Sequence, residues 1–527
     1  MLRDFFFGEK KILTLNTIFF HLALILLSFL FVWLFSHSTS FRYSFIGLDS
    51  AVFQVVGKYW AEGFIPYKDF FDHKGAIIYL INALGYAIYP RSGIMVPQII
   101  FLYISCLFIW RTLGLFCHGG KKIFFFALTL FYYAAHYWEG NNCGEYTMPF
   151  LAASTYCFMR FIINRENICP PLYGFIYGIS FGGCVLLRAS NAMPTCCYVF
   201  LTAIFLLHAR EFKNLWKNFL SFCAGFASIV LPFVIYFAAH DALYDMFYGT
   251  ILFNTSYATQ GKVEYELALR LHAIAVKLMP LSLLIFFSVL LLVRDVKNKL
   301  AWSGIFVGVM MAILLMNLRI YRHYYMTVVP IIPLLFVILK QSHENFKNVI
   351  NSPRFSLKRF FSKVIIVSVP AYALVCYCMY SLPLIQYFSP KFISDENTVY
   401  AEEMRDIRQL QMLIPEDERK SFACWGNFYS TSHWILVTDM KPQERFFMNN
   451  SVLSLLDSRL KTEWFQTVND TPILWILYGE PKEKKEKYKI DEHREDPDVE
   501  RLLAEKYTLR GEFSIYDQIM KLYRLND

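Results

Sequence analysis

Residues 12–35 read ILTLNTIFFHLALILLSFLFVWLF, and this uncharged apolar run is followed by a long segment at 36–92 that is rich in charge. A helix needs about 20 mostly apolar residues to cross a bilayer, so residues 12–35 predict a membrane span. Further runs of this kind predict about 11 transmembrane helices in total. The others lie at 93–116, 123–138, 146–163, 171–187, 190–208, 218–239, 274–293, 301–318, 324–340 and 363–386. The apolar stretch at 76–90 is too short to span comfortably, and we expect a surface or re-entrant helix there.

The composition also favours a membrane body. Of the 527 residues, 56% are hydrophobic and only 18% are charged, whereas a soluble domain carries about 25% charged residues. Residues 1–390 hold 31 Lys and Arg against 16 Asp and Glu, while residues 391–527 hold 20 against 26. We therefore expect a transmembrane domain at 1–390 followed by a soluble, mildly acidic domain at 391–527. Since the basic excess lies in the membrane body, it is no argument for a nucleic-acid partner.

Lysine and arginine predict the orientation, because they gather in loops on the cytoplasmic side of a membrane. With the N-terminus inside, most cations of the body fall in interior loops, and an odd number of spans places residues 391–527 outside. Apolar residues at helical spacing predict a helix at 398–414 of this tail, and apolar runs at 421–425 and 472–478 predict buried strands. The sequence thus indicates an all-α polytopic membrane protein with a C-terminal exterior α/β domain.

The first exterior loop, residues 36–92, carries the densest group of charges near the predicted membrane. Valines and aromatic residues recur there at helical spacing, which predicts an amphipathic helix at 51–63 lying at the membrane interface. Asp49 comes just before this helix. As a functional residue it is a general base or a metal ligand, and as a structural residue it caps the helix. The sequence leaves both roles open.

The same loop contains Asp72-His73-Lys74-Gly75, which brings an anion, a titratable ring and a cation into consecutive positions. The His and Lys side chains are suited to bind a phosphate, and Gly75 would let the backbone approach it closely. The alternative is a solvated turn between two surface helices.

Other polar groups lie at the predicted exterior ends of the spans. Glu139 and Glu145 flank a short loop with two asparagines, which is either part of a polar site or an exposed loop with a helix cap. Arg188 either snorkels to the interface or binds an anionic headgroup. Arg322 and His323 form a basic cluster on the side where cations are rare, so they either anchor the chain or bind a lipid phosphate.

Together these positions offer carboxylates in the first loop and cations from distant segments on the same face. Such a set suits a reaction on a phosphate-bearing lipid, because a phosphate leaving group carries negative charge that nearby cations stabilise. The middles of the spans are nearly free of charge, which argues against a transporter with a charged site at the bilayer midplane.

Several of these motifs match one family. They are Gly47-Leu48-Asp49-Ser50, Phe53, Gly57, Ile65-Pro66-Tyr67-Lys68-Asp69, Phe71-Asp72-His73-Lys74-Gly75, Glu145-Tyr146, Leu187-Arg188 with Asn191, and Tyr321-Arg322-His323-Tyr324. In these residues the chain resembles the bacterial GT-C glycosyltransferases, in the branch related to protein O-mannosyltransferases and to the aminoarabinose transferase of lipid A. The first-loop block is the most specific part of the resemblance.

The resemblance implies a GT-C-like membrane fold, a polyprenyl-phosphate sugar donor and an inverting transfer on the exterior face, with an acidic residue of the first loop as base. Asp49 matches that acidic position, and Asp72 is the second residue expected to be catalytic. The residues expected to bind substrate are His73, Lys74, Glu145, Arg188, Asn191, Arg322, His323 and Tyr324. Among them, Arg188, Arg322 and His323 would meet the lipid phosphate. Relatives often have Pro where this chain has Ala76, Ala189 and Arg322, which bears on loop geometry and on the phosphate contacts.

No cofactor is firmly implied, although Asp49 and Asp72 are placed in the sequence so that they could share a divalent cation. The implied partners are a polyprenyl-phosphate-linked sugar, a lipid, glycan or protein acceptor, and the lipids of the bacterial inner membrane. Two alternatives stay open: a transporter or flippase of lipid-linked sugars, and a polysaccharide polymerase or ligase. In the last class we expect the main exterior loop late in the membrane body, whereas here the largest loop is the first.

Overall fold

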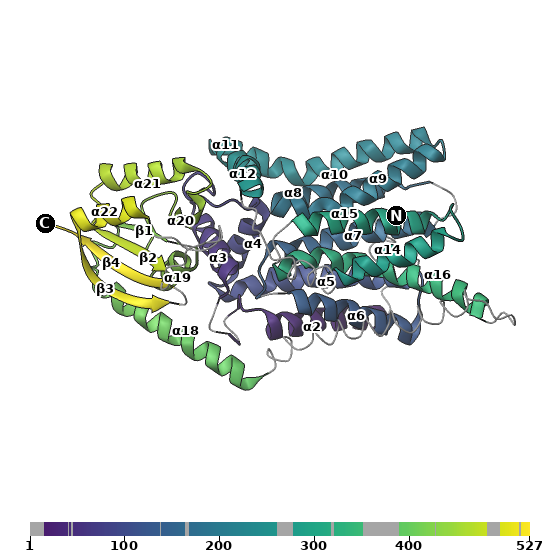
Figure 1. Cartoon of the computed structure of the whole chain (residues 1–527), viewed down its shortest axis with the longest axis horizontal. Coiled ribbons are helices and arrows are strands. Elements are labelled where there is room, and N and C mark those ends of the chain that lie inside the picture. Colours follow the sequence, from purple (N-terminus) through teal and green to yellow (C-terminus); the bar gives the residue numbers. More distant parts are fainter. Residues whose placement is uncertain are drawn as a thin grey trace.

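The computed structural model of the chain describes residues 15–39, 42–43, 46–137, 139–163, 168–260, 278–317, 321–350, 389–426, 428–448, 450–481, 496–515 and 518–527. A long helical body occupies one end of the molecule and a mixed α/β domain occupies the other (Figure 1). Six helical segments in these ranges are long and apolar enough to cross a membrane: Leu15–Phe35, Ser92–Gly114, Pro171–His208, Phe212–Ala239, Lys299–Met316 and Arg322–Glu344. The chain therefore has the architecture of a multi-pass membrane protein.

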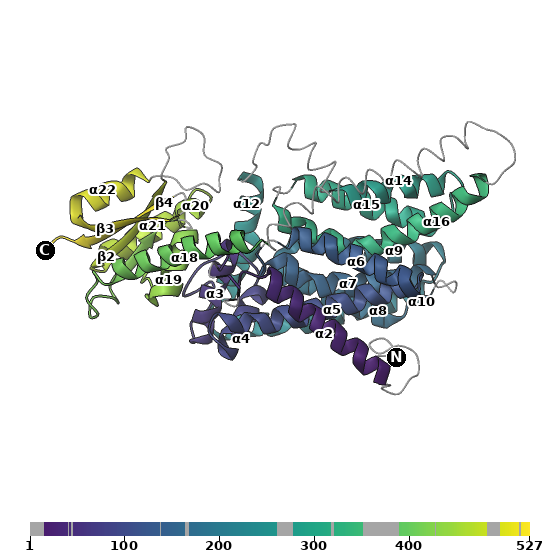
Figure 2. The same cartoon turned by 90° about the horizontal axis from the view of Figure 1, so that it is seen from below.

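The helices of the body lie side by side (Figures 1 and 2). They are α2 (Leu15–Phe35), α5 (Met95–Gly114), α6 (Gly119–His136), α7 (Cys143–Ile163), α8 (Pro171–Arg188), α9 (Met193–His208), α10 (Phe212–Ala239), α14 (Met279–Leu292), α15 (Lys299–Asn317) and α16 (Ile332–Ile350). The 3₁₀ segments η1 (Ser92–Ile94), η2 (Ala189–Ala192) and η5 (Arg322–Ile331) precede α5, α9 and α16. Within the described residues, each predicted span from 12–35 to 324–340 overlaps a helical segment, while the run at 363–386 lies outside the described residues.

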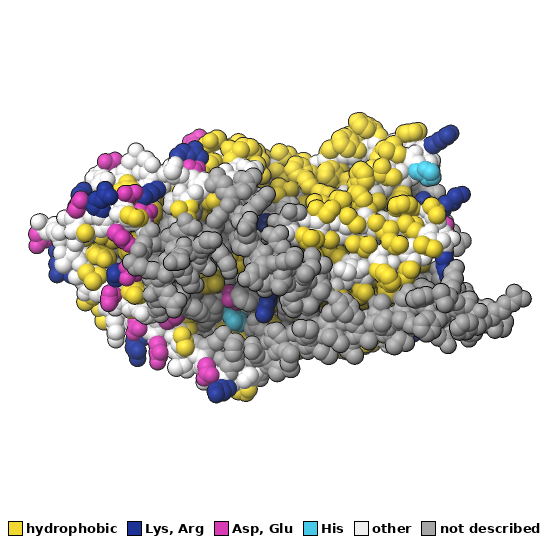
Figure 3. All heavy atoms as spheres, viewed as in Figure 1, with side chains coloured by type: hydrophobic (Ala, Val, Ile, Leu, Met, Phe, Trp, Pro, Cys, Tyr) yellow, Lys and Arg dark blue, Asp and Glu magenta, His cyan; other side chains and the backbone are white. Residues whose placement is uncertain are grey.

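The outer surface of the body is apolar. Leu231 and Ile235 of α10, for example, are at least half exposed. Figure 3 shows hydrophobic side chains gathered over the helical body and charged side chains over the α/β domain. Because soluble monomers rarely expose large contiguous apolar patches, a lipid environment accounts for this surface.

Two helices of the first loop, α3 (Leu48–Ala61) and α4 (Ala76–Ile88), lie between the body and the α/β domain (Figures 1 and 2). The helix predicted at 51–63 is therefore present, but the residues of α3 from Ser50 to Tyr59 are all buried. Its apolar stripe packs against α4 and the C-terminal domain, so protein and not lipid covers it. The short helix predicted at 76–90 is α4, whose exposed Leu84 and Ile88 are suited to face lipid.

The C-terminal domain is built on a four-stranded sheet in the order β1-β2-β4-β3. The strands are β1 (Phe422–Trp425), β2 (Trp475–Pro481), β3 (Tyr507–Ile515) and β4 (Gln518–Leu525), with β1 and β2 parallel and the other pairs antiparallel. The helices are α18 (Pro390–Gln411), α19 (Phe428–Thr438), α20 (Asn450–Leu453), α21 (Ser458–Asp470) and α22 (Pro497–Lys506). Trp425 and Trp464 meet in the core with their ring centroids 4.9 Å apart.

The helix and the two strands predicted for this domain are confirmed as α18, β1 and β2. The hairpin of β3 and β4 was missed, because its apolar residues alternate with charges such as Arg510, Glu512 and Lys521 and form no continuous apolar run. α18 begins at Pro390, where the sequence predicted the domain boundary. The division into two domains at that residue stays a prediction.

The C-terminal domain packs directly on the first loop. Residues of α3, such as Val56, share one hydrophobic cluster with Trp434 of α19. The Phe71 amide donates a hydrogen bond to the Arg445 carbonyl at 3.1 Å, and an ion pair joins Lys58 to Asp439. Three further helical segments follow α10: α11 (Leu243–Phe247), the π-helical η3 (Tyr248–Leu252) and α12 (Phe253–Gln260). Of these, η3 and α12 contact the first loop. The first loop is thus held between the membrane body and the α/β domain.

Candidate functional site

The backbone at Gly47 sets the position of Asp49. Gly47 has a φ of +90° at the start of α3, a conformation that other residues rarely adopt. A β-carbon there would lie 2.9 Å from Oε2 of Glu139. That oxygen accepts a hydrogen bond from the Leu48 amide at 3.0 Å, so the exposed amide at the start of α3 is satisfied by Glu139. The structure therefore excludes the alternative in which Asp49 caps the helix.

Asp49 lies in the first turn of α3, and its side chain is half-buried. Within the described residues, no group hydrogen-bonds or ion-pairs with its carboxylate. Burial raises the pKa of Asp49 above its ordinary value, the positive charge of Lys74 opposes this, and the negative charge of Asp72 adds to it. A carboxylate with a raised pKa is a better proton acceptor, so Asp49 has the chemistry of a general base.

Asp72, His73 and Lys74 form a chain of hydrogen bonds. His73 Nδ1 lies 3.1 Å from Asp72 Oδ1, and His73 Nε2 lies 2.6 Å from Lys74 Nζ. The Tyr79 hydroxyl donates to Asp72 Oδ2 at 2.6 Å. Asp72 is 8% exposed and His73 is 7% exposed, which excludes the alternative of a solvated turn.

The environment of this trio fixes its charges. Burial alone would raise the pKa of Asp72, but the hydrogen bond from His73 and the charge of Lys74 bring it below the usual range. Burial lowers the pKa of His73, and the charge of Lys74 lowers it further. At neutral pH His73 is therefore an uncharged ring, with Nδ1 next to the Asp72 carboxylate and Nε2 next to the Lys74 amine.

Gly75 brings this trio to the end of α8. Its amide donates to the Leu187 carbonyl at 3.2 Å, and a β-carbon at position 75 would lie 2.0 Å from the Leu186 carbonyl oxygen. Only glycine allows two backbone segments to approach so closely. Arg188, the last residue of α8, thereby comes near Lys74, and the charges of both act on Asp49.

Arg188 also joins the site to η5. Its guanidinium carbon lies 3.7 Å from the centroid of the Tyr324 ring, a cation–π contact. Arg188 and Lys74 lie close enough to His323 for their charges to act on its ring. The structure thus gathers predicted site residues from the first loop, α8 and η5 around one carboxylate.

Glu145 is placed differently, in the scaffold behind this group. It is 1% exposed, and its oxygens accept hydrogen bonds from the Tyr137 hydroxyl at 2.8 Å, the Gln98 amide at 3.2 Å and the Asn141 backbone amide at 2.7 Å. Asn141 in turn donates to the Ser50 hydroxyl at 2.9 Å, next to Asp49 in the chain. The geometry of Glu145 is that of a residue that holds the loop in place.

Asn191 and Arg322 are likewise not joined to Asp49. Asn191 is 1% exposed, and its side-chain amide donates to the Thr147 hydroxyl at 3.3 Å, which ties η2 to α7. Arg322 begins η5 and is not among the charges that act most on Asp49. Contacts of Glu145, Asn191 and Arg322 with a substrate stay predictions.

Three residues that position the trio were not predicted as site residues, although one of them, Tyr67, lies in the first-loop motif. Besides Tyr79, the Tyr67 hydroxyl donates to the Lys74 carbonyl, and the Asn254 side chain donates to the His73 carbonyl, both at 2.7 Å. Tyr79 had looked like part of an apolar stretch, and Asn254 lies on α12, far away in the chain. No local pattern in the sequence marks these contacts, because they depend on the tertiary fold.

Within the described residues, no group of three or more His, Cys, Asp and Glu side chains is arranged to hold a metal ion. A divalent cation shared by Asp49 and Asp72 therefore stays a prediction.

The chain shares its fold with solved membrane transferases of the GT-C class, which confirms the resemblance of its motifs at the level of the fold. In particular, the structure matches the ArnT aminoarabinose transferase from Cupriavidus metallidurans in the apo state with a TM-score of 0.53 and 10% sequence identity, covering 96% of this chain and 98% of that chain. The same transferase bound to undecaprenyl phosphate matches over the same shares with a TM-score of 0.52.

The archaeal oligosaccharyltransferase AglB from Archaeoglobus fulgidus, in complex with an inhibitory peptide and a dolichol-phosphate, matches with a TM-score of 0.46 and 10% identity, over 88% of this chain and 70% of that chain. No protein-family model and no curated protein sequence matches the chain.

Proposed function

We propose that the chain is a membrane glycosyltransferase that moves a sugar from a polyprenyl-phosphate donor to an acceptor at the exterior face of the bacterial inner membrane. The transfer inverts the configuration of the sugar, and Asp49 is the general base. The fold shared with a transferase that binds undecaprenyl phosphate supports the class of donor. The arrangement of Asp49, Lys74 and Arg188 supports the chemistry.

In the proposed reaction, a hydroxyl of the acceptor attacks the anomeric carbon of the sugar. The new bond to the acceptor oxygen forms while the bond to the phosphate oxygen breaks. Asp49 accepts the proton of the attacking hydroxyl, and the polyprenyl phosphate leaves with the bonding electron pair. The raised pKa of Asp49 suits this role, because its affinity for a proton is higher than that of a solvated aspartate.

The leaving phosphate gains negative charge as the bond breaks. Lys74 and Arg188 are the cations whose charges reach Asp49, and His323 lies within reach of both. In the proposal Lys74, Arg188 and His323 bind the leaving phosphate, and Arg322 also binds it when substrate is present. Asp72 acts on the reaction indirectly, since its hydrogen bond to His73 orients the ring that meets Lys74.

One observation carries the proposal: Asp49 is half-buried beside cations from two segments, yet it makes no hydrogen bond or ion pair within the described residues. A carboxylate placed there for stability alone would be expected to have partners, because burying an unpaired charge costs free energy. An open carboxylate next to cations fits a residue that meets its partner only when substrate is bound.

The test is to reconstitute the purified chain in sealed vesicles with a polyprenyl-phosphate sugar labelled in the sugar, and to follow both covalent product and movement of the label. The proposal expects the label in a covalently glycosylated acceptor and free polyprenyl phosphate in equal amount. Label that crosses the bilayer still attached to its lipid, without a product, would establish the transporter or flippase instead. Addition of EDTA to the same assay tests whether a divalent cation takes part.

A further inference from the structure

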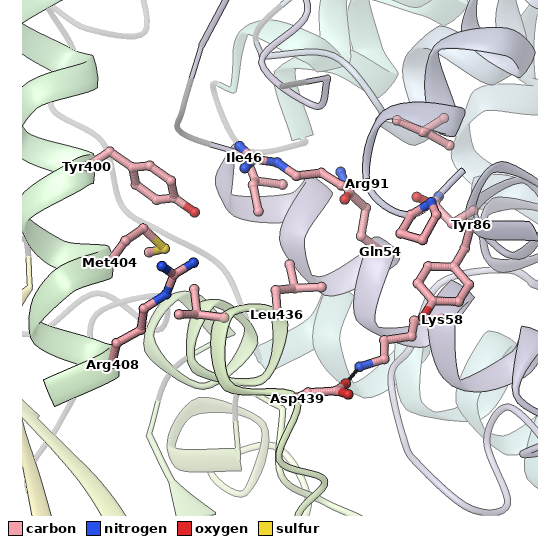
Figure 4. Close-up of a pocket in the computed structure, with 14 residues that line it drawn as sticks. Ile46, Gln54, Lys58, Tyr86, Arg91, Tyr400, Met404, Arg408, Leu436 and Asp439 are labelled. Atoms are coloured by element: carbon pink, nitrogen blue, oxygen red, sulfur yellow. Dashed lines mark ion pairs between the residues drawn. The ribbon is translucent and has the colours of Figure 1, made fainter. Parts of the chain in front are cut away.

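A cavity lies on the other side of α3, between the first loop and the C-terminal domain. Its volume is about 350 Å³, within the range of small-molecule sites. Figure 4 shows side chains of both parts pointing into it. Gln54 and Lys58 of α3 line it, and they follow Asp49 by five and nine residues. At 3.6 residues per turn these positions are turned by about 140° and about 180° from Asp49, so the cavity is separate from the proposed transfer site.

The charged groups of this cavity are mostly cations. Lys58 comes from α3, Arg91 follows α4, and Arg408 comes from α18, while Asp439 is the acidic residue among the lining side chains. A groove of about 540 Å³ continues it outward and shares Arg91 and Arg408 with it, and this groove adds Arg405. Since Asp439 pairs with Lys58, the arginines leave an excess of positive charge.

Arg405 and Arg408 are not neutralised by carboxylates of the lining. Arg408 is exposed and forms no ion pair in the part of the chain that the structure describes. Arg405 pairs with its own neighbour Asp406 at a distance of 3.6 Å, with an Arg405 side chain that is 66% exposed. Exposed ion pairs of this kind contribute little and are easily exchanged for a better partner.

The remaining lining suits the body of a polar molecule. Tyr86 of α4 and Tyr400 of α18 line opposite walls, and Figure 4 shows Tyr400 and Arg408 extending from α18 toward the first loop. Aromatic walls with a few convergent polar groups are typical of ligand pockets. Guanidinium groups bind phosphate with two parallel hydrogen bonds, which makes arginine the preferred residue for such a group.

We infer that this cavity and its groove bind the phosphate group of a molecule other than the sugar donor, held between Arg91 of the first loop and Arg405 and Arg408 of α18. The phosphate belongs either to a lipid headgroup or to a soluble phosphorylated sugar or alcohol. Because its cations come from both parts of the chain, the bound molecule fastens the C-terminal domain to the first loop. This inference does not rest on the role of Asp49.

The experiment measures the binding of short-chain phosphatidylglycerol and of glycerol 1-phosphate to the purified full-length chain in a neutral detergent. Arg405→Gln/Arg408→Gln removes two exposed cations of the groove, and Arg91→Gln removes the cation on the opposite wall. Arg501→Gln, an exposed arginine of α22 outside the groove, is the matched control. We expect the Kd of the tighter probe to rise about tenfold or more in both groove variants and to stay unchanged in the control.

The two probes distinguish the sources of the phosphate. Tighter binding of phosphatidylglycerol identifies a lipid headgroup, and equal binding of the two identifies a soluble phosphate compound. Equal affinities of the wild type, the groove variants and the control, or no binding of either probe to the wild type, would overturn the inference. The variant Asp49→Asn is expected to bind the probes like the wild type, so failure of the proposed transfer reaction and failure of this site are told apart.

Discussion

Acidic side chains at the first loop differ in the number of hydrogen bonds that their oxygens accept from the protein. Glu145 has both oxygens filled by donors of the protein, and Glu139 accepts the first amide of α3. Asp49 lies at the start of the same helix and has no such donor within the described residues. Asp72 is intermediate, because its oxygens already bind Tyr79 and His73.

This difference teaches that a carboxylate near the membrane surface is not by itself a mark of catalysis. A carboxylate whose hydrogen-bonding capacity is used by the protein holds the fold, because removing it leaves buried donors unsatisfied. A carboxylate that has no donor from the protein and whose pKa is raised lowers the stability of the fold. Such a carboxylate is a candidate for a catalytic role. Substitutions around Asp49 test this division, and their expected effects decrease from the cations to the helix start.

The cations beside Asp49 should contribute to the binding of the polyprenyl-phosphate sugar. In Lys74→Gln and in Arg188→Gln we expect the KM for the polyprenyl-phosphate sugar to rise roughly tenfold to a hundredfold, because each variant loses a charge-assisted contact to phosphate. Steady-state transfer assays measure this effect. Lys68→Gln, an exposed lysine of the same loop, is the control and should keep the wild-type KM. An unchanged KM in both site variants would place the donor elsewhere.

Removing the scaffold carboxylate should instead lower stability. We expect Glu145→Gln to lose about 1–3 kcal/mol, since the side-chain NH2 of the glutamine cannot accept from the donors that face one of the two oxygens of Glu145. Thermal unfolding of the purified protein measures the loss. The fraction that stays folded should keep the wild-type kcat and KM. A stable variant with a raised donor KM would show that Glu145 contacts substrate, as the sequence predicted.

The pH dependence should report the environment of Asp49. The base must be deprotonated, so kcat/KM is lost as the pH falls through the pKa of Asp49. Since burial raises that pKa, the acidic limb should have its midpoint above the ordinary value for an aspartate. The charge of Asp72 should persist to lower pH, because its pKa is lowered. A limb at or below the ordinary value would argue against a buried base.

The smallest effect concerns the helix start. Glu139→Gln keeps an acceptor oxygen for the Leu48 amide but removes the charge, so we expect a loss of about 1 kcal/mol or less. Thermal unfolding is again the measurement, with transfer activity followed in parallel. A large loss of kcat without loss of stability would mean that Glu139, rather than Asp49, takes part in the reaction.

Most helices of the membrane body could be predicted from the sequence, because the length of an apolar run is enough to indicate a membrane span. The first loop around Asp49 could also be found, since residues 36–92 carry the densest group of charges near the predicted membrane. The burial of α3 could not be predicted, because its apolar stripe looks the same whether lipid or the C-terminal domain covers it. The different roles of Asp49 and Glu145 could not be predicted either, since they depend on which hydrogen-bond donors the fold brings to each carboxylate.

The most direct test of the account is the rate of sugar transfer by Asp49→Asn, measured in a single turnover with saturating donor. We expect a fall of roughly 100-fold to 10,000-fold, the usual range for removal of a general base. The variant should bind undecaprenyl phosphate like the wild type and be at least as stable to heat at neutral pH, because a buried charge with a raised pKa opposes folding. Transfer at the wild-type rate by the folded Asp49→Asn variant would contradict the account.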